Sequence, residues 1–262
     1  MSVAEYLMLF GGGLLAGVIN TLAGNGSAIT LSLLIFTGMP ANVANATNRI
    51  GALLQTFTAV VSLRRTKRTG LMFRDSFWFI IPSILGSIIG AFLAVDIDPD
   101  VLQYTIGGFM VILLFTLLNK PKKWLKATNV SKSHKTTFNW IAIFLTAVYG
   151  GFIQMGIGII LLSVLVLVAE YSLRDANIIK LVLTFIFVVP AFFIFWFSGD
   201  MRWEPGFAMA LGQGIGAVVG ARYILYMPKA NLYVRWLLIV ILSVSAVVLL
   251  NIPQVVGNFA GW

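Results

Sequence analysis

Two cations lie inside apolar stretches of this sequence, and each follows an asparagine by about one helical turn. Arg49 comes four residues after Asn45, and Lys180 comes three residues after Asn177. Residues spaced in this way share one face of a helix, so each pair can present a charge and an amide to the same ligand. A guanidinium offers oxyanions a planar fork of donors, and an ammonium offers a compact point charge. The pattern therefore predicts a binding site for an anion.

A pair of glycines precedes each asparagine at the same distance. Asn45 follows Gly26 by 19 positions, and Asn177 follows Gly158 by 19 positions. Backbone N–H groups at a glycine break, together with the N-terminus of a half-helix, can cradle an anion. Ser27 is suited to cap such a half-helix over residues 28–36. The residues expected to complete the site are Asn20, Gly24, Asn25, Gly26, Ser27, Asn48, Gln154, Gly156, Gly158 and Gln213.

A cation in the middle of a membrane helix needs a partner, because its insertion costs about 2.5–3.5 kcal/mol. The acidic residues weighed as partners lie near segment ends or at the opening of a helix: Glu5, Asp96, Asp98, Asp100, Glu170, Asp175, Asp200 and Glu204. We therefore expect an anion from outside the protein to be held between Arg49 and Lys180. The alternative is that the amides only join neighbouring helices and that the cations extend to lipid headgroups.

The residue types exclude several kinds of chemistry. The chain has no cysteine and a single histidine, His134, which lies in a polar loop. Disulfides, thiolate metal sites and cysteine nucleophiles are therefore excluded. A histidine-based metal centre and a Ser-His-Asp triad are excluded as well. We expect no catalytic residue, no metal and no cofactor, and an intramembrane enzyme is the least supported interpretation.

The composition is that of a membrane protein. Of the 262 residues, 59% are hydrophobic and 10% are charged, whereas about 25% are charged in a soluble domain. Apolar runs long enough to cross a bilayer as helices recur along the chain. The predicted fold class is an all-α, polytopic helical membrane protein embedded in the lipid bilayer. The net charge of +9 is concentrated in short loops, as the positive-inside rule requires, so it does not indicate a nucleic-acid partner.

Eight apolar segments fall into two sets of four, and the first segment of each set is broken. They cover residues 4–37, 43–63, 75–95 and 101–119, then 138–169, 176–198, 204–226 and 232–251. We assign residues 1–119 to a first transmembrane repeat, 120–137 to a basic connector and 138–262 to a second repeat. The broken segments are too long for one straight crossing, since about 32 residues of helix measure about 48 Å and the hydrocarbon core is about 30 Å thick. Each is either a hairpin or a kinked single pass.

Small residues in both halves favour close helix packing. The pattern Gly86-x-x-x-Gly90 recurs as Gly216-x-x-x-Gly220, which Gly212 precedes. Glycines at this spacing allow helix backbones to approach closely, so we interpret them as scaffold. The same match makes Ser83 the counterpart of Gln213.

Loop charges predict the orientation. Residues 64–74 and the connector 120–137 are basic and are expected in the cytoplasm, whereas the acidic loop 96–100 is expected outside. The loop at 200–204 has little positive bias, and the next loop, flanked by Arg222 and Lys229, is expected inside. Matching loops of the two halves then face opposite sides. This favours an inverted repeat over eight simple crossings with parallel halves.

The residues at these two places resemble the TauE/SafE family of sulfite and organosulfonate exporters. The resemblance rests on residues 20–27 and 44–49 and on their partners at 150–154 and 176–180, and it covers almost the whole chain. It implies a multi-pass protein of the prokaryotic inner (plasma) membrane that moves sulfur-containing oxyanions, mostly outward. The sequence departs from the family at Gly24-Asn25-Gly26, where the family usually has three consecutive small residues. Asn25 is therefore a candidate for altered selectivity.

We expect a secondary transporter that exports small sulfur oxyanions, such as sulfite or sulfonates, by alternating access. Moving one negative charge out of a cell with a negative interior gains about 2.3 kcal/mol per 100 mV. Uniport could therefore drive export, and the coupling ion stays unknown. The alternatives are an anion channel of the same architecture and a membrane scaffold or partner subunit without transport. The sequence leaves homo-oligomerisation open.

Overall fold

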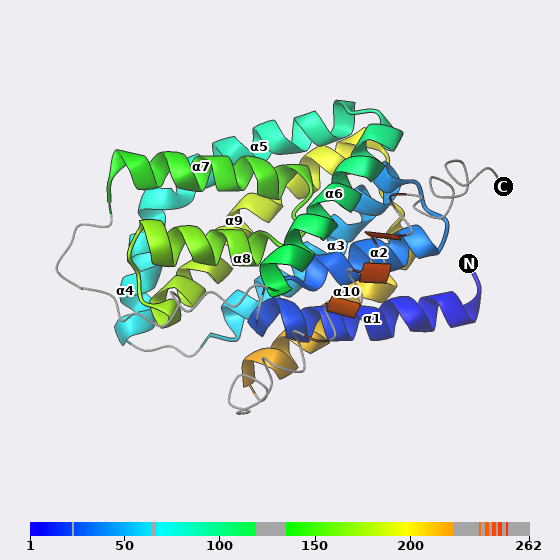
Figure 1. Cartoon of the computed structure of the whole chain (residues 1–262). Coiled ribbons are helices and arrows are strands. Elements are labelled where there is room, and N and C mark those ends of the chain that lie inside the picture. Colours follow the sequence, from blue (N-terminus) through cyan, green and yellow to red (C-terminus); the bar gives the residue numbers. More distant parts are fainter. Residues whose placement is uncertain are drawn as a thin grey trace.

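The computed structural model describes residues 1–22, 24–63, 67–118 and 135–222, together with isolated positions between 236 and 250. Every regular element within these residues is helical, as expected (Figure 1). Most of the connector 120–137, including His134, and most of the segment 232–251 lie outside the described residues. The helices are α1 (Val3–Leu22), α2 (Gly26–Phe36), α3 (Ala41–Val61), α4 (Lys67–Ser76), the 3-10 turn η1 (Phe77–Phe79), α5 (Ile80–Asp96), α6 (Pro99–Leu118), α7 (Thr137–Phe152), α8 (Ile157–Ser163), the π-helix η3 (Val164–Val168), α9 (Leu173–Ser198) and α10 (Trp203–Arg222).

The first broken segment is a helical hairpin. Helix α2 folds back along α1. The two helices approach closely, since a β-carbon on Gly26 would collide with the Ala16 carbonyl and one on Gly12 would collide with Leu33. The chain reverses at Gly24, whose φ of 78° lies in the left-handed region that glycine adopts without strain. Of the two alternatives for this segment, the kinked single pass is therefore wrong.

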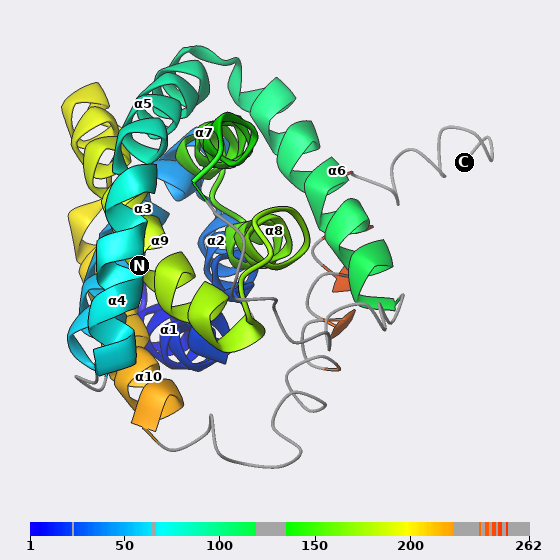
Figure 2. The same ribbon diagram turned by 90° about the vertical axis from the view of Figure 1, so that its left-hand side faces the viewer.

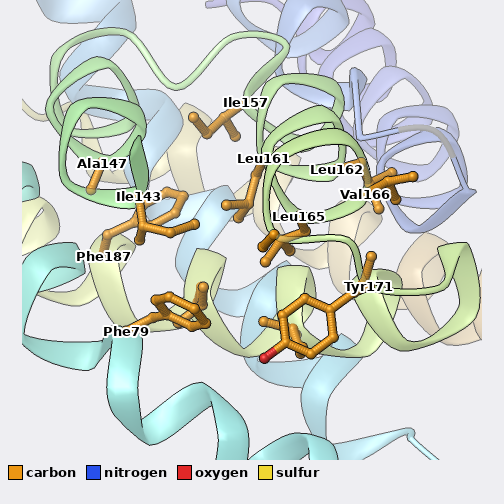
Figure 3. Close-up of a cluster of buried hydrophobic side chains, with 14 of the residues drawn as sticks. Phe79, Ile143, Ala147, Ile157, Leu161, Leu162, Leu165, Val166, Tyr171 and Phe187 are labelled. Atoms are coloured by element: carbon orange, nitrogen blue, oxygen red, sulfur yellow. The ribbon is translucent and has the colours of Figure 1, made fainter. Parts of the chain in front are cut away.

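The second broken segment is a hairpin as well. Ile143 and Ala147 of α7 share one apolar cluster with Leu161 of α8 and Leu165 of η3 (Figure 3). The chain reverses between α7 and α8, where Gly156 has a φ of 69°. Viewed along the helices, α7 and α8 lie side by side with α2 next to them, and α6 lies on the outside (Figure 2).

The two hairpins extend toward opposite ends of the molecule, and their tips meet between them (Figure 1). The Gly158 N–H donates to the Gly24 carbonyl at 3.2 Å. A β-carbon on either glycine would collide with the Cα of the other. The two glycine breaks, 134 positions apart in sequence, are therefore in direct backbone contact.

Each hairpin packs along a helix from the other half of the sequence. Helix α1 lies against α10, and α7 lies against α5. The contacts have the same form, since Gly212 and Gly216 meet the carbonyls of Phe10 and Leu14, and Gly86 and Gly90 meet those of Phe144 and Val148. Both pairs run parallel. The described residues of the two predicted repeats, up to 118 in the first and 138–222 in the second, thus interlock and do not pack as two separate bodies.

These contacts correct one detail of the sequence match. They pair Gly86 with Gly212 and Gly90 with Gly216, one helical turn earlier than the expected pairing with Gly216 and Gly220. The counterpart of Gln213 in this register is Ser87, not Ser83. The glycine pattern alone could not decide this, because three glycines repeat at the same spacing in α10.

Helices α3 and α9 run antiparallel past the hairpin tips. The rings of Phe57 and Phe185 lie 6.0 Å apart, and Ile50 shares an apolar cluster with Phe195. Helix α9 contains Pro190 and crosses the molecule over 26 residues. The two predicted cations therefore lie on two long helices packed against each other.

Three described stretches are long and apolar enough to span a membrane: Val3–Thr21, Thr69–Asp96 and Leu173–Ser198. The second is longer than expected, because α4, η1 and α5 follow one another without a loop. The basic stretch 64–74, predicted to be a loop, is therefore helical from Lys67 onward. Met72 explains this difference, since α4 packs against α9 and Met72 packs on the apolar cluster of α8 and α9.

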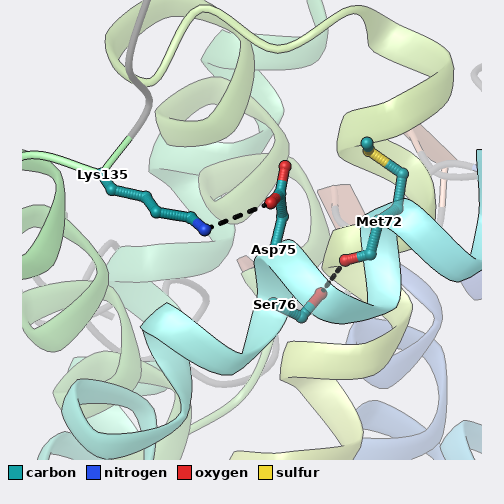
Figure 4. A network of polar contacts seen from close by, with 4 residues as sticks. All are labelled: Met72, Asp75, Ser76 and Lys135. Carbon is teal, nitrogen blue, oxygen red and sulfur yellow. Dashed lines mark hydrogen bonds and ion pairs between the residues drawn. The ribbon is translucent and has the colours of Figure 1, made fainter.

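Polar contacts tie each end of the molecule together. At one end Lys135, just before α7, pairs with Asp75 of α4 at 3.5 Å, beside the bond from Ser76 to the Met72 carbonyl (Figure 4). At the other end the Tyr6 hydroxyl donates to Glu204 at 2.9 Å. The basic stretch around α4 and the end of the connector therefore lie on one side of the molecule.

Candidate functional site

Arg49 is buried on α3, and its guanidinium caps the end of α7. Nη1 donates to the Gly150 carbonyl at 2.8 Å, and Nη2 donates to the carbonyls of Gly151 and Phe152 at 2.8 and 3.0 Å. The group also lies over the Phe195 ring, 4.8 Å from its centroid. The last carbonyls of a helix accept no hydrogen bond from within the helix, and they lie at the negative end of its dipole. Protein oxygens therefore compensate this buried charge.

Two side-chain amides complete the surroundings of the guanidinium. Gln154 Oε1 accepts from Nη1 at 3.0 Å, and Asn45 Oδ1 accepts from Nη2 at 3.4 Å. Asn45 Nδ2 also donates to the Phe152 carbonyl at 2.9 Å. All of these acceptors are neutral, so the expectation that an anion from outside the protein binds at Arg49 stays a prediction. The sequence points to carboxylates as candidate partners of Arg49 and gives no sign of the C-terminus of α7.

Lys180 on α9 is the opposite case. Its side chain is 2% exposed, and Nζ has no hydrogen-bond partner among the residues that the structure describes. Asn177, one turn earlier, likewise has an unpartnered Oδ1 there. A buried ammonium without an acceptor is costly, so Lys180 is the cation whose charge is left to be compensated.

The two cations do not face a shared position. The Arg49 guanidinium lies at Phe195, and Lys180 precedes Phe195 by 15 positions on the same helix. That separation corresponds to about 22 Å of helical rise, several times the width of an anion with three oxygens. Because Arg49 also reaches back toward Asn45, one compact anion cannot touch both cations in this conformation. The expectation of a single anion held between Arg49 and Lys180 stays a prediction, which this conformation does not fulfil.

Asn25 lies at the hairpin tips with neither side-chain atom satisfied. It is fully buried, and both Nδ2 and Oδ1 lack a partner within the described part of the chain. Its Oδ1 would lie 3.2 Å from a β-carbon on Gly156 of the other hairpin. Asn25 precedes the first residue of α2, so it and not Ser27 is the N-cap residue, although its side chain makes no capping bond. The first N–H groups of a helix have few acceptors within it, and Asn25 directly precedes those of α2.

Two further amides adjoin the tips with an unpartnered NH₂ group. Asn48 accepts from Thr30 of α2 at 2.6 Å through Oδ1, and Gln154 accepts from Arg49 through Oε1. Nδ2 of Asn48 and Nε2 of Gln154 have no partner in the described residues. Thr30 was missed from the sequence, although it lies one turn after Ser27 and donates to that residue's carbonyl as well, at 3.2 Å.

The remaining predicted residues line the surrounding helices. The Asn20 carbonyl accepts from Gly24 N at 3.0 Å and so closes the end of α1. Gln213 of α10 lies against Gly51 of α3, where a β-carbon would collide with Nε2, and that atom is unpartnered among the described residues. Ser87, its counterpart in the contact register, instead bonds to the Phe187 carbonyl. Ser87 and Thr30 are uncharged and lie outside the two glycine breaks, so neither could be recognised as a site residue from the sequence.

Unpartnered nitrogens outnumber unpartnered oxygens in the predicted site. Within the described residues the nitrogens are Asn25 Nδ2, Asn48 Nδ2, Arg49 Nε, Gln154 Nε2, Lys180 Nζ and Gln213 Nε2, and the oxygens are Asn25 Oδ1 and Asn177 Oδ1. Buried polar atoms are nearly always paired in native proteins. A surplus of donors suits a ligand rich in acceptors, which is what an oxyanion is. No group of three His, Asp or Glu side chains that could hold a metal occurs in the described residues.

Comparison with known proteins agrees with a transporter. The model of the family described as "Sulfite exporter TauE/SafE" matches residues 9–249. The probable membrane transporter protein ORF9 of Sinorhizobium sp is 28% identical over 248 residues, which are 94% of this chain and 92% of that protein. A probable membrane transporter protein of Haemophilus influenzae is 28% identical over 233 residues, 89% of each chain. The probable membrane transporter protein YfcA of Escherichia coli K12 is 28% identical over 244 residues, 93% of this chain and 88% of that one.

No solved structure shows a significant match. The family and these relatives are described as transporters and not as enzymes. The apolar helices are those of a multi-pass membrane protein. This chain is accordingly a membrane transporter, and it belongs to the TauE/SafE sulfite exporter family.

Proposed function

We propose that the protein exports small sulfur-containing oxyanions, such as sulfite or sulfonates, and binds them at the hairpin tips. The observation that carries this proposal is the surplus there of buried N–H donors that have no partner among the described residues. Asn25, Asn48 and Gln154 supply amide donors, and the first turn of α2 supplies backbone N–H groups. The proposal takes its sulfur chemistry from the family, which is described as sulfite exporters.

Lys180 supplies the uncompensated positive charge in this proposal. It lies seven residues, or about 10 Å of helical rise, from Phe187, which borders Gly150 beside the second tip. An anion at the tips and Lys180 attract each other across a medium of low dielectric constant. Lys180 therefore draws the anion toward its own end of the molecule.

We propose alternating access between two inverted halves, residues 1–119 and 138–262. The opposed directions of the hairpins (Figure 1) and the matching contacts of α1 with α10 and of α7 with α5 support this arrangement. In such transporters the site lies at the interface of the repeats, near the middle of the bilayer. Separation of the tips on one side or the other would expose the site to one compartment at a time.

We place the protein in the inner (plasma) membrane of a prokaryote, with residues 64–74 and the connector 120–137 in the cytoplasm. The pairing of Lys135 with Asp75 supports a common side for these two stretches, and their basic charge favours the inside. Lys180 then lies in the cytoplasmic half. An anion drawn from the cytoplasm and released outside moves down the membrane potential, so export needs no coupling ion.

Purified protein in detergent tests binding, and proteoliposomes with an imposed potential test flux. Sulfite, thiosulfate, sulfate and a sulfonate are compared with chloride. A true ligand stabilises the folded protein by mass action, by about 2.7 kcal/mol at a concentration of 100 times Kd. The melting temperature rises accordingly. We expect one sulfur oxyanion to stabilise the protein and to be transported outward. Absence of both responses would contradict the proposal. Single-channel currents would show that the protein is a channel and not a carrier.

A further inference from the structure

We infer that Arg49 is a positioning residue that acts through Gln154: it turns the glutamine amide so that its NH₂ group faces the bound anion. This inference rests on the proposed function, since it concerns how the same site is organised. It differs from the expectation raised by the sequence, in which Arg49 itself holds the anion.

Hydrogen-bond chemistry determines the orientation of the glutamine amide. A guanidinium has five N–H donors and no acceptor, so the atom of Gln154 that lies 3.0 Å from Nη1 is the oxygen. The NH₂ group then points away from Arg49. It is buried, with the side chain 1% exposed, and it is unpartnered among the described residues. Arg49 thereby fixes the orientation of the Gln154 amide, so that its NH₂ group can donate only on the side away from Arg49.

The terminal nitrogens of the guanidinium are already in use. Nη1 and Nη2 together make the bonds to the three carbonyls of Gly150, Gly151 and Phe152 and to the two amides. Only Nε lacks a partner within the described part of the chain. An arginine held in this way cannot offer the planar fork through which it normally grips an oxyanion.

The backbone at Gln154 points to a role for its side chain. Gln154 has a φ of 65°, in the left-handed region that is unfavourable for residues other than glycine. The positions after helices α2 and α9 that adopt this conformation are glycines, Gly38 and Gly199, with φ of 84° and 83°. Glu170, after η3, is the other non-glycine residue with a positive φ, at 58°, among the described residues. A glycine at 154 would relieve the strain but would remove the amide. A strained glutamine at this position is explained if its side chain serves the site.

A double-mutant cycle on anion affinity separates positioning from direct contact. The variants are Arg49→Lys, Gln154→Met and the double variant, with sulfite as the probe in detergent. We expect Gln154→Met to weaken binding by about tenfold, since it removes one hydrogen bond to a charged group. If Arg49 acts through Gln154, Arg49→Lys causes no further loss of affinity in the Gln154→Met protein. Losses that multiply would overturn the inference, because they would mean that Arg49 contacts the anion itself.

A second comparison needs no arginine variant, and its melting measurement needs no ligand. Gln154→Glu keeps an oxygen for Arg49, whereas Gln154→Met keeps none. We expect the glutamate variant to melt above the methionine variant and to lose sulfite binding, because an acceptor has replaced the donor. A glutamate variant that melts at or below the methionine variant would show that Arg49 does not use this oxygen. If the unsubstituted protein binds no sulfur oxyanion, the proposed function fails, while this melting comparison still decides the orientation.

Discussion

The Gly158 N–H donates to the Gly24 carbonyl at 3.2 Å, and through this bond two hairpins from opposite ends of the molecule touch backbone to backbone. A single inter-hairpin bond of this kind contributes about 1 kcal/mol. It is weak enough to break in each transport cycle. The close approach requires glycine on both sides, since a β-carbon on either residue would collide with the other.

Substitution at this contact should separate the tips. Gly158→Ala is expected to lower the free energy of unfolding by about 1–3 kcal/mol, which is the usual effect of overpacking, and to reduce flux strongly. Thermal unfolding in detergent and proteoliposome flux measure the two effects. Gly108→Ala on α6 is the matched control, because a β-carbon there meets no described atom within 4 Å. Equal behaviour of the two variants would show that the tips are not in contact.

Arg49 is expected to be essential for stability. Arg49→Gln leaves the last carbonyls of α7 without their donors, and breaking a buried charged network by removing one partner typically costs about 3–5 kcal/mol. We therefore expect a large drop in melting temperature in the absence of any anion. Arg202→Gln serves as the control, because the Arg202 side chain is exposed. A melting temperature for Arg49→Gln equal to that of the control would contradict the capping role.

Much of the site could be predicted because its signals are local. Apolar length, glycine pairs and cations inside hydrocarbon stretches identified the broken segments and the buried polar residues. Asn25, Asn48, Gln154 and Lys180 were selected by type and spacing alone, and each is buried with an unpartnered nitrogen among the described residues. A polar residue inside an apolar stretch is easily recognised in the sequence, since polar residues are otherwise rare in membrane helices.

The partner of Arg49 could not be predicted, because it is a set of backbone carbonyls about 100 positions away. Carbonyls carry no sequence signal, and only the fold brings the C-terminal end of α7 within reach of the Arg49 and Asn45 side chains. The same limit explains the register of α5 and α10, which backbone contacts at Gly86 and Gly212 determine. It also explains α4, where a tertiary contact through Met72 stabilises a helix in a basic stretch.

Lys180 should show the opposite balance between stability and function. Its Nζ lacks an acceptor among the described residues, so Lys180→Met removes a charge whose burial costs about 2.5–3.5 kcal/mol. We expect the variant to melt at or above the temperature of the unsubstituted protein while anion flux is lost. Arg49→Gln provides the contrast, since it should lose stability and flux together. A Lys180→Met protein that still carries sulfite at the normal rate would exclude a role for this charge in transport.

Asn25 separates recognition of the anion from the structure of the hairpin. Asn25→Asp keeps the shape of the side chain, and a negative charge at the N-terminus of α2 is favourable for the helix. The dipole offsets only part of the cost of burying the carboxylate, so the variant should fold with a lower melting temperature, and the carboxylate replaces a donor with a charged acceptor and repels an incoming anion. We expect sulfite to stabilise this variant no more than chloride does. Asn42→Asp at the start of α3 is the matched control, since Asn42 also has an unpartnered oxygen among the described residues but lies outside the predicted site. Loss of sulfite binding in both variants would mean that added negative charge acts at long range, whereas loss in Asn25→Asp alone identifies Asn25 as a contact of the anion.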